Sequence, residues 1–186
     1  MSDLTPAQEQ LRAHLLEHAV RTGDFTLKSG RKSSWFIDGK QTACRPDGIT
    51  LVAEVALERL DGVDAIGGLT MGADPVAYGI AAIAAVRGVE LRSFSIRKEA
   101  KDHGVAGRVA GALQPGDRVA ITEDVVTRGT SPMEAAQVVR DFGATPVMIM
   151  PIVDRGGTCG AMATAAGIEF QPMLTAEDLG FTYEGP

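Results

Sequence analysis

The stretch Val-Ala-Ile-Thr-Glu-Asp-Val-Val-Thr-Arg-Gly-Thr-Ser occupies residues 119–131. Its first half is short, mostly apolar and rich in β-branched residues, which predicts a buried parallel strand that ends at the two acids. A short turn follows. Beyond it, Ser131, Pro132 and Glu134 match an N-cap, a proline at the first helical position and a capping-box acid. The sequence therefore predicts a strand, a turn and a helix N-terminus in direct succession.

The turn has the features of an anion site. Backbone N–H groups of the turn and the positive end of the helix dipole would point at one phosphate group. Thr127, Thr130 and Ser131 can add hydroxyl donors, and Arg128 can add positive charge. We therefore predict that one phosphate binds at this turn.

Two adjacent acids, Glu123 and Asp124, stand beside the predicted phosphate site. Carboxylates beside a phosphate repel a polyanionic ligand unless they bind an uncharged part of it. Because ionised carboxylates only accept hydrogen bonds, the vicinal hydroxyls of a ribose suit them. Our local hypothesis is a site for a ribose 5-phosphate. The alternative is an ordinary strand end with solvated acids and a capped helix, which a short motif does not exclude.

The composition indicates one globular domain. The chain has 186 residues, of which 45% are hydrophobic, and this suits a single domain with a sizeable core. Its net charge of −6 argues against a nucleic-acid surface. No apolar run approaches the ~18 residues of a membrane span, and no signal-peptide pattern opens the chain. Cys44 and Cys159 are far apart, so we expect two free thiols in a reducing cytoplasm.

Periodic patterns along the chain predict alternating strands and helices. Such alternation implies a mostly parallel sheet covered by helices on both faces. Ligands of such sheets bind at the carboxyl ends of the strands, where the candidate loops of this chain all fall. We predict helices over residues 5–21, 46–60, 73–87, 131–143 and 160–166, a hairpin within 25–38, and strands over 65–68, 91–96, 119–124, 146–153 and 169–174.

The first predicted helix carries two histidines. His14 and His18 are four residues apart and therefore lie on one helix face, a spacing that could serve a metal ion. No third ligand is near them in the sequence. We therefore expect both to be solvated side chains.

Two further segments carry candidate ligand-binding side chains. In the predicted hairpin, Lys28 and the aromatic pair Trp35 and Phe36 could contact a flat anionic base; the alternative is a hairpin with a solvated basic tip. Residues 97–108 form the densest cationic segment of an acidic protein. Such a run is usually a solvated charged loop, but its glycines are also typical of a mobile loop over a ligand.

An arginine follows the strand predicted over residues 146–153. Because Arg155 leaves the carboxyl end of a parallel strand, its side chain is predicted to point into the ligand crevice. A guanidinium holds a carboxylate in a bidentate manner better than any other side chain. The glycine-rich loop at residues 68–75 lets the backbone approach a ligand closely, but it lacks the Gly-Lys-Ser/Thr of a P-loop.

Three of these segments resemble known motifs. Residues 119–131 resemble the signature of the type I phosphoribosyltransferases, which bind 5-phosphoribosyl 1-diphosphate (PRPP). They depart from it where Thr122 interrupts the apolar run and where Arg128 replaces a small residue. Residues 25–33, Phe-Thr-Leu-Lys-Ser-Gly-Arg-Lys-Ser, are similar to the hood of the orotate phosphoribosyltransferases. Residues 97–104, Arg-Lys-Glu-Ala-Lys-Asp-His-Gly, resemble the flexible catalytic loop of the same family.

This resemblance implies a fold and an organisation. The expected fold is α/β and type I phosphoribosyltransferase-like, with a mostly parallel central sheet flanked by helices. Residues 1–186 would form one domain, in which residues 1 to about 40 and the C-terminal segment form a small hood. It further implies a cytoplasmic homodimer whose loop at 97–108, here called the lid, is shared between subunits. No nucleic acid and no membrane are expected as partners.

The resemblance also assigns roles to residues. Lys101, His103 and Asp124 are the expected catalytic residues, and Mg²⁺ is expected to be held mainly through PRPP, with no direct protein ligand. The residues expected to bind orotate are Lys28, Phe36, Thr127 and Arg155. Those expected to bind PRPP are Arg97, Lys98, Lys101, His103, Glu123, Asp124, Val125, Val126, Thr127, Arg128, Gly129, Thr130 and Ser131.

The implied reaction transfers the ribose 5-phosphate of PRPP to orotate, giving orotidine 5′-phosphate and diphosphate in UMP biosynthesis. Many members of the family place a lysine in the loop at 68–75, whereas this chain has Gly-Ala-Asp-Pro. Two alternatives remain at this point. One is a phosphoribosyltransferase for another base, and the other is a non-catalytic regulator that senses PRPP.

Overall fold

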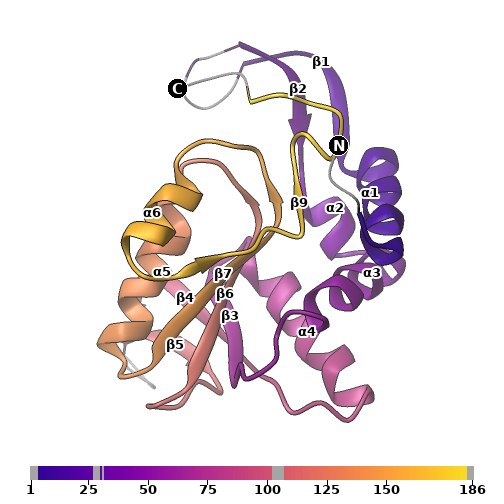
Figure 1. Cartoon of the computed structure of the whole chain (residues 1–186). Coiled ribbons are helices and arrows are strands. Elements are labelled where there is room, and N and C mark those ends of the chain that lie inside the picture. The colour runs from indigo at the N-terminus through magenta and orange to yellow at the C-terminus, as the bar shows by residue number, and fades with distance from the viewer. Residues whose placement is uncertain (1–3, 27–29, 31, 102–106, 184–186) are drawn as a thin grey trace.

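The computed structural model describes residues 4–26, 30, 32–101 and 107–183, without the side chains of Ala100 and Lys101. Within this part of the chain, seven strands form one central sheet. They are β3 (Ala65–Leu69), β4 (Arg92–Lys101), β5 (Gly107–Gly111), β6 (Arg118–Val126), β7 (Thr145–Asp154), β8 (Glu169–Phe170) and β9 (Leu174–Thr175). Their order is β5-β4-β3-β6-β7-β8, with β9 beside β7. Only β4 and β5 pair in antiparallel fashion, which confirms the mostly parallel sheet (Figure 1).

Helices cover both faces of this sheet, as the alternation predicts (Figure 1). One apolar cluster joins the sheet to four helices, and a second joins its other face to two. The helices of the first cluster are α1 (Pro6–His18), α2 (Lys40–Ala43), α3 (Pro46–Leu57) and α4 (Ala73–Val86), and those of the second are α5 (Thr130–Asp141) and α6 (Cys159–Ala165).

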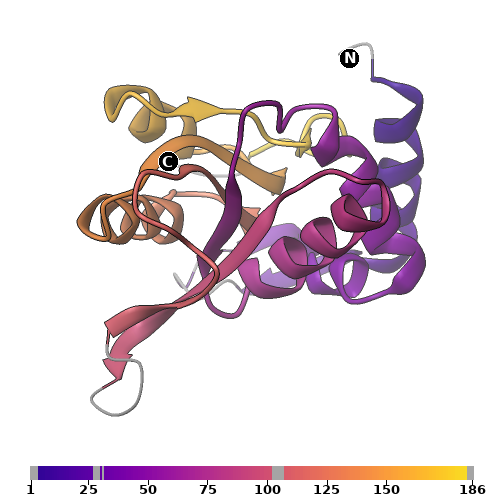
Figure 2. The same cartoon turned by 90° about the horizontal axis from the view of Figure 1, so that it is seen from below.

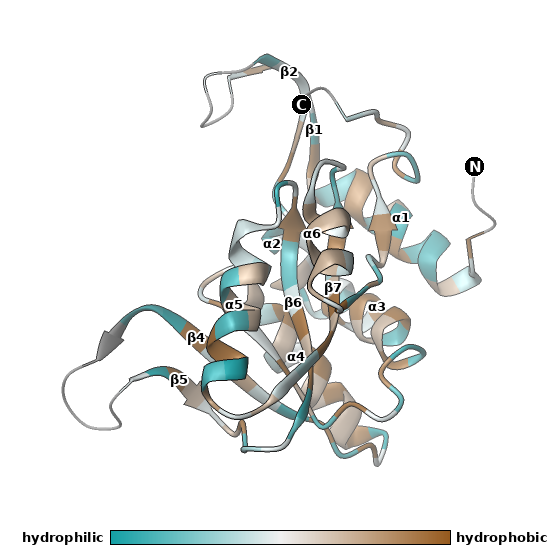
Figure 3. Ribbon diagram, turned by 60° about the vertical axis from the view of Figure 1, so that its left-hand side comes forward, coloured by the Kyte–Doolittle hydropathy of each residue, from teal (hydrophilic) through white to brown (hydrophobic). Residues whose placement is uncertain are grey.

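Alternation along the central strands separates the two apolar clusters. In β6, Ala120 belongs to the cluster with α3 and α4, whereas Val119 and Ile121 belong to the cluster with α5. Successive side chains of a strand point to opposite faces, so the part of a strand that is covered on both sides is apolar at nearly every position, as it is over residues 119–121 of β6. Figure 3 shows hydrophobic residues along these central strands and a mixture of both kinds along α5.

A two-stranded hairpin stands apart from the main sheet (Figure 1). It pairs β1 (Val20–Thr26) with β2 (Lys32–Ile37) in antiparallel register. The C-terminal segment returns to it, and the ring of Phe181 stacks on that of Trp35 with centroids 4.6 Å apart. The hairpin predicted within residues 25–38 is therefore present, but its first strand begins earlier.

The structure corrects the prediction for the lid. Instead of ending at Ile96, β4 continues to Lys101 and pairs with β5, a strand that the sequence patterns did not predict. Residues 97–101 and 107–108 of the lid are thus part of a β-hairpin, which projects from the sheet in Figure 2. The strand extends because a neighbouring antiparallel strand supplies its hydrogen bonds, which an alternation of apolar residues does not reveal.

The start of α5 also differs from the prediction. Gly129, with φ 86°, is the N-cap, and neither Ser131 nor any other side chain caps the helix. A Cβ atom at Gly129 would lie 2.8 Å from Cys159 Cα, so both the backbone angle and the space require glycine there. Glu134, predicted to complete a capping box, instead pairs with Arg108 of β5.

Helix α1 begins as predicted but ends earlier than residue 21. The Thr5 hydroxyl accepts a hydrogen bond from the Gln8 backbone N–H, and the Gln8 side-chain oxygen accepts one from the Thr5 backbone N–H, which is the expected capping box. The helix ends at His18 because Val20 already pairs with Ile37 in the hairpin.

The prediction that both histidines are solvated is wrong for His14, which is only 7% exposed. Helix α3 and the short helix α2 (Lys40–Ala43) cover it. Cys44 and Cys159 are free, as predicted. No helix among the described residues has the length and apolar character needed to span a membrane.

Candidate active site

Glu123 and Asp124 lie near the carboxyl end of β6, at the edge of the sheet where ligands of such folds bind. The strand does not end at them as predicted. It continues through Val125 and Val126, which pair with Val153 and Asp154 of β7. The two acids therefore stand on rigid strand backbone, and Glu123 Oε1 accepts a hydrogen bond from the Asp124 N–H at 3.3 Å.

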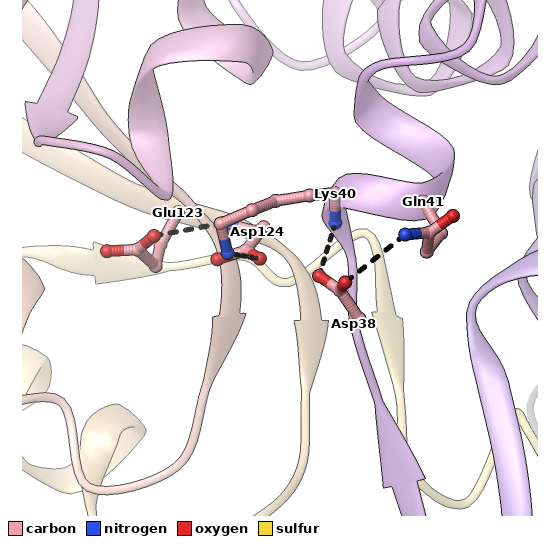
Figure 4. Close-up of polar contacts among 5 residues, drawn as sticks. All are labelled: Asp38, Lys40, Gln41, Glu123 and Asp124. Atoms are coloured by element: carbon pink, nitrogen blue, oxygen red, sulfur yellow. Dashed lines mark hydrogen bonds and ion pairs between the residues drawn. The ribbon is translucent and has the colours of Figure 1, made fainter.

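A lysine that the sequence analysis did not select meets these acids. Lys40 Nζ lies 2.6 Å from Asp124 Oδ2, and Figure 4 shows its side chain reaching over from α2. Asp38 fixes the start of α2 by accepting a hydrogen bond from the Lys40 backbone N–H at 3.2 Å. Although burial works against it, the hydrogen bond and charge of Asp124 raise the pKa of Lys40. The lysine is therefore a cation within the site.

One pocket gathers residues from five segments of the chain. Five of the residues expected to bind PRPP line it, namely Lys98, Glu123, Asp124, Val125 and Ser131, together with Lys40 and residues 69–72. Lys98 comes from β4, where the side chain is exposed. The structure thus brings the lid hairpin, the two acids and the start of α5 to one place, as the shared sheet edge predicts.

The backbone of the loop after β3 lies against the acids. A Cβ atom at Gly72 would stand 1.6 Å from Glu123 Oε1 and 2.7 Å from Asp124 Oδ1, so only glycine leaves room for the acids. Asp74 accepts hydrogen bonds from Thr70 Oγ1 at 2.7 Å and from Ser95 Oγ at 2.6 Å. This loop carries no lysine, and Lys40 supplies a cation to the same pocket from another element.

The remaining residues of the expected PRPP set have other surroundings. Arg97 donates from Nη1 to the Gly107 carbonyl at 3.3 Å, within the hairpin. Val126 is buried in the core, so it can offer a ligand only its backbone. Thr127 and Arg128 form the turn, Gly129 caps α5 and Thr130 is its first residue. Lys28 and His103 lie outside the described residues, as does the side chain of Lys101.

The pKa of Glu123 is perturbed in the folded protein. Burial raises the pKa of Glu123 to about 8, and the hydrogen bond and charge of Asp124 add to this shift. The backbone N–H of Asp124 and the charge of Lys40 oppose it. A protonated Glu123 donates as well as accepts hydrogen bonds, so at neutral pH its carboxyl group differs from the ionised acid that the sequence predicts.

This shift predicts how the stability of the unliganded protein depends on pH. Because the folded pKa of Glu123 lies above its unfolded value of 4.5, its contribution is fully present below pH 4.5 and is lost as the pH rises through about 8. We expect Glu123→Gln to remove this loss. After allowance for partial solvent screening, the variant should exceed wild type by about 2 kcal/mol at pH 9.

Urea unfolding at pH 5, 7 and 9 measures this difference in the free energy of unfolding. Glu90→Gln is the matched control, because Glu90 is exposed on the surface and its replacement should leave the pH dependence unchanged. A Glu123→Gln curve parallel to that of wild type would contradict the assignment.

A second region of the site lies under the hairpin. Arg155 follows β7, and its guanidinium carbon is 4.3 Å from the centroid of the Trp35 ring. It also lines a pocket with Asp154, Gly156, Thr175, Ala176, Glu177 and Tyr183. The predicted crevice position of Arg155 is therefore supported by geometry.

The expectation that Trp35 contacts a base is wrong. The Trp35 side chain is 1% exposed, enclosed by Phe181 and Arg155. Its neighbour Phe36 points to the other face of β2 and is 40% exposed, as strand alternation requires. Of this aromatic pair, Phe36 is therefore the residue whose side chain is open to a ligand.

Comparisons with known proteins agree with these observations. No protein-family model matches the chain. The orotate phosphoribosyltransferase of Bradyrhizobium diazoefficiens is 40% identical over 177 residues, which cover 90% of this chain and 95% of the relative. The crystal structure of the Mycobacterium tuberculosis orotate phosphoribosyltransferase with Fe(III) dicitrate is 31% identical, with a TM-score of 0.84 over 95% of this chain and all of that one. The structure of that enzyme with PRPP is 27% identical, with a TM-score of 0.80 over the same shares. The chain belongs to the orotate phosphoribosyltransferase family.

Proposed function

We propose that this chain transfers the ribose 5-phosphate of PRPP to orotate, giving orotidine 5′-phosphate and diphosphate in pyrimidine biosynthesis. The observation that carries the proposal is one pocket that holds Lys98, Glu123 and Asp124 together. A relative of the same fold has been crystallised with PRPP. The acids would bind the ribose hydroxyls, and the turn before α5 would bind the 5-phosphate through its backbone N–H groups.

The reaction breaks the bond between the ribose and diphosphate, and the enzyme must stabilise positive charge on the sugar and negative charge on the leaving diphosphate. As the bond from the ribose to diphosphate breaks, the sugar becomes cation-like, and Asp124 lies where it would favour that charge. Lys98, with Lys101 and His103 of the lid, would neutralise the departing diphosphate. Preorganised charges that act where charge develops often supply the largest catalytic contribution. A closed lid would also keep water from the sugar cation.

Magnesium fits this site as a partner of the substrate. The pocket offers carboxylate oxygens, which Mg²⁺ prefers, but Lys40 already neutralises Asp124 at 2.6 Å. We therefore propose that Mg²⁺ is held mainly by the oxygens of PRPP. There it would offset diphosphate charge and make the leaving group better.

The proposed assembly is a homodimer in which the lid of each subunit covers the site of the other. Its support is the β4–β5 hairpin, which projects from the body of the chain and carries the exposed Lys98 (Figure 2). The two free thiols suit a reducing compartment such as the cytoplasm. Sedimentation velocity measures the number of subunits in the assembly. Activity that reappears when an inactive lid variant is mixed with an inactive site variant would show that the lid of one subunit serves the site of the other.

Ultraviolet detection of orotate loss, with PRPP and magnesium, tests the reaction directly. A panel of purine bases separates this function from transfer to another base. If the protein did not bind PRPP under any condition, both orotate transfer and transfer to another base would be contradicted. Binding of PRPP without consumption of any base would instead favour the non-catalytic regulator, which a salt-dependent gel shift would then examine for nucleic acid.

Arg155 is proposed to hold the orotate carboxylate. We expect Arg155→Ala to raise KM for orotate about 10–100-fold, because a charge-assisted hydrogen-bonded pair is worth about 1.5–3 kcal/mol. KM for PRPP should change little. Arg155→Lys keeps the charge but not the planar fork, so it should recover only part of the loss. Steady-state kinetics with each substrate varied in turn measure this, and equal effects on both KM values would contradict the assignment.

A further inference from the structure

A buried histidine, one ring nitrogen of which makes no hydrogen bond, is not among the residues that line the two pockets of the active site. His14 of α1 is 7% exposed, and its Nε2 atom is buried. Among the described residues, no group makes a hydrogen bond to this nitrogen. Leaving a buried polar atom without a hydrogen bond costs free energy, so such an atom in a native fold needs an explanation, and a bound ion is one.

Two further ligand-type side chains surround this nitrogen. Asp47 Oδ2 of α3 lies 3.4 Å from His14 Nε2, which is within ion-pair distance if the ring is protonated. The ring of His18, one turn along α1, is centred 4.5 Å from that of His14. One ligand atom from each of the three residues lies within 4.8 Å of the other two. Two helices thus bring two imidazoles and a carboxylate to one point.

The other nitrogen of His14 favours the tautomer that metal binding needs. His14 Nδ1 and Thr42 Oγ1 of α2 are 3.1 Å apart, and the threonine side chain is fully buried. When Nδ1–H donates to this hydroxyl, Nε2 keeps its lone pair for a metal ion. Metal-binding histidines almost always make such a second contact, which fixes the ring and its tautomer.

Close packing holds this ring in place. A Cβ atom at Gly48 would lie 2.7 Å from His14 Cε1 and 2.3 Å from the Thr42 carbonyl oxygen. Glycine at this position of α3 therefore lets α3 approach both α1 and α2.

We propose that His14, His18 and Asp47 form a site for a divalent transition metal ion such as Zn²⁺, which joins α1 to α3. Zinc takes imidazole nitrogen and carboxylate oxygen at about 2.0–2.2 Å, with tetrahedral geometry that places ligand atoms about 3.3 Å apart. The 3.4 Å between His14 and Asp47 already matches this spacing. The partly exposed His18 ring closes the remaining distance by rotation, and water takes the fourth position. Mg²⁺ is disfavoured because it prefers oxygen ligands.

Equilibrium dialysis of the metal-free full-length chain against Zn²⁺, with Mg²⁺ as the comparison ion, measures the binding. We expect one Zn²⁺ bound per chain at this site and a rise of several degrees in the midpoint of thermal unfolding. No such rise is expected with Mg²⁺ in the absence of PRPP. X-ray absorption of the zinc-loaded chain should show only nitrogen and oxygen ligands. A sulfur ligand, or no saturable zinc, would overturn the proposal.

Variants assign the zinc to these residues. His18→Gln and Asp47→Asn alter partly or fully exposed side chains, so the fold should survive, and each should weaken zinc binding more than about 10-fold. Thr42→Val, which removes the partner of His14 Nδ1, should weaken it about 10–100-fold.

The controls are Glu58→Gln at an exposed acid, Cys44→Ser at the exposed thiol and His103→Gln at the third histidine of the chain. All three should keep wild-type zinc affinity. Loss of zinc with Cys44→Ser or His103→Gln, together with unchanged affinity in His18→Gln and Asp47→Asn, would place the metal elsewhere and overturn the assignment. Because binding is measured without substrates, this outcome is independent of the proposed reaction.

Discussion

Replacing Asp124 with asparagine is expected to lower kcat/KM for PRPP about 10²–10³-fold, while KM for orotate changes little. Removal of a single preorganised group that faces developing charge has effects of this size in other enzymes. Asp124 is 7% exposed and lies on strand backbone beside Glu123, so it is held in place before the substrate arrives. Asparagine keeps the shape but loses the negative charge that would stabilise a cation-like sugar.

The same variant leaves Lys40 without its anionic partner, and this effect needs its own control. Lys40→Met alone and the double variant complete a mutant cycle, which separates the loss of the ion pair from the loss of charge at the sugar. Asp141→Asn, at an exposed acid that hydrogen-bonds only Gln137 among the described contacts, controls for the change in net charge. Unchanged kcat/KM for PRPP in Asp124→Asn would remove this acid from the mechanism.

The second large effect is expected at the lid. Lys101→Ala should lower kcat at least about 10²-fold, because the resemblance places this lysine on the leaving diphosphate and such a group is worth about 3–4 kcal/mol. The backbone of Lys101 pairs with Gly107 at the end of the β4–β5 hairpin, and alanine preserves that pairing. The midpoint of thermal unfolding should therefore stay near that of wild type.

Single-turnover kinetics at saturating PRPP isolate the chemical step from product release. Glu99→Ala is a suitable control, since Glu99 is an exposed residue of the same strand, two positions away. If Lys101→Ala turned over at the wild-type rate in single turnovers, the lid would have no part in the chemistry.

Much of the fold is predictable from the sequence because apolar periodicity records which faces are buried. The strands over 65–68 and 146–153 were located to within two residues, since both are covered on two sides. Strand β5 was missed because its residues alternate weakly and its pairing partner is set by tertiary structure. The N-cap of α5 was misplaced because the reason for Gly129 is not local. A Cβ atom there would be too close to Cys159, thirty residues away in the sequence.

The site shows a similar division. Adjacent acids beside a turn are visible in a sequence, and the structure gathers Lys98, Glu123 and Asp124 as the shared sheet edge implies. Lys40 was missed because it stands 84 positions from Asp124, and no local pattern connects the two. The raised pKa of Glu123 depends on burial and on its neighbours in space, which spacing does not encode.

The chain has a single tryptophan, and it lies between the ring of Phe181 and the guanidinium of Arg155. Tryptophan fluorescence, excited selectively at the long-wavelength edge of the indole absorption, therefore originates from one known place without any introduced label. An arginine that turns toward an anionic base must leave or tilt over the indole, and this alters the emission of that one chromophore. Binding of the base alone can thus be followed by the emission of Trp35, which contacts Arg155 of the proposed base site.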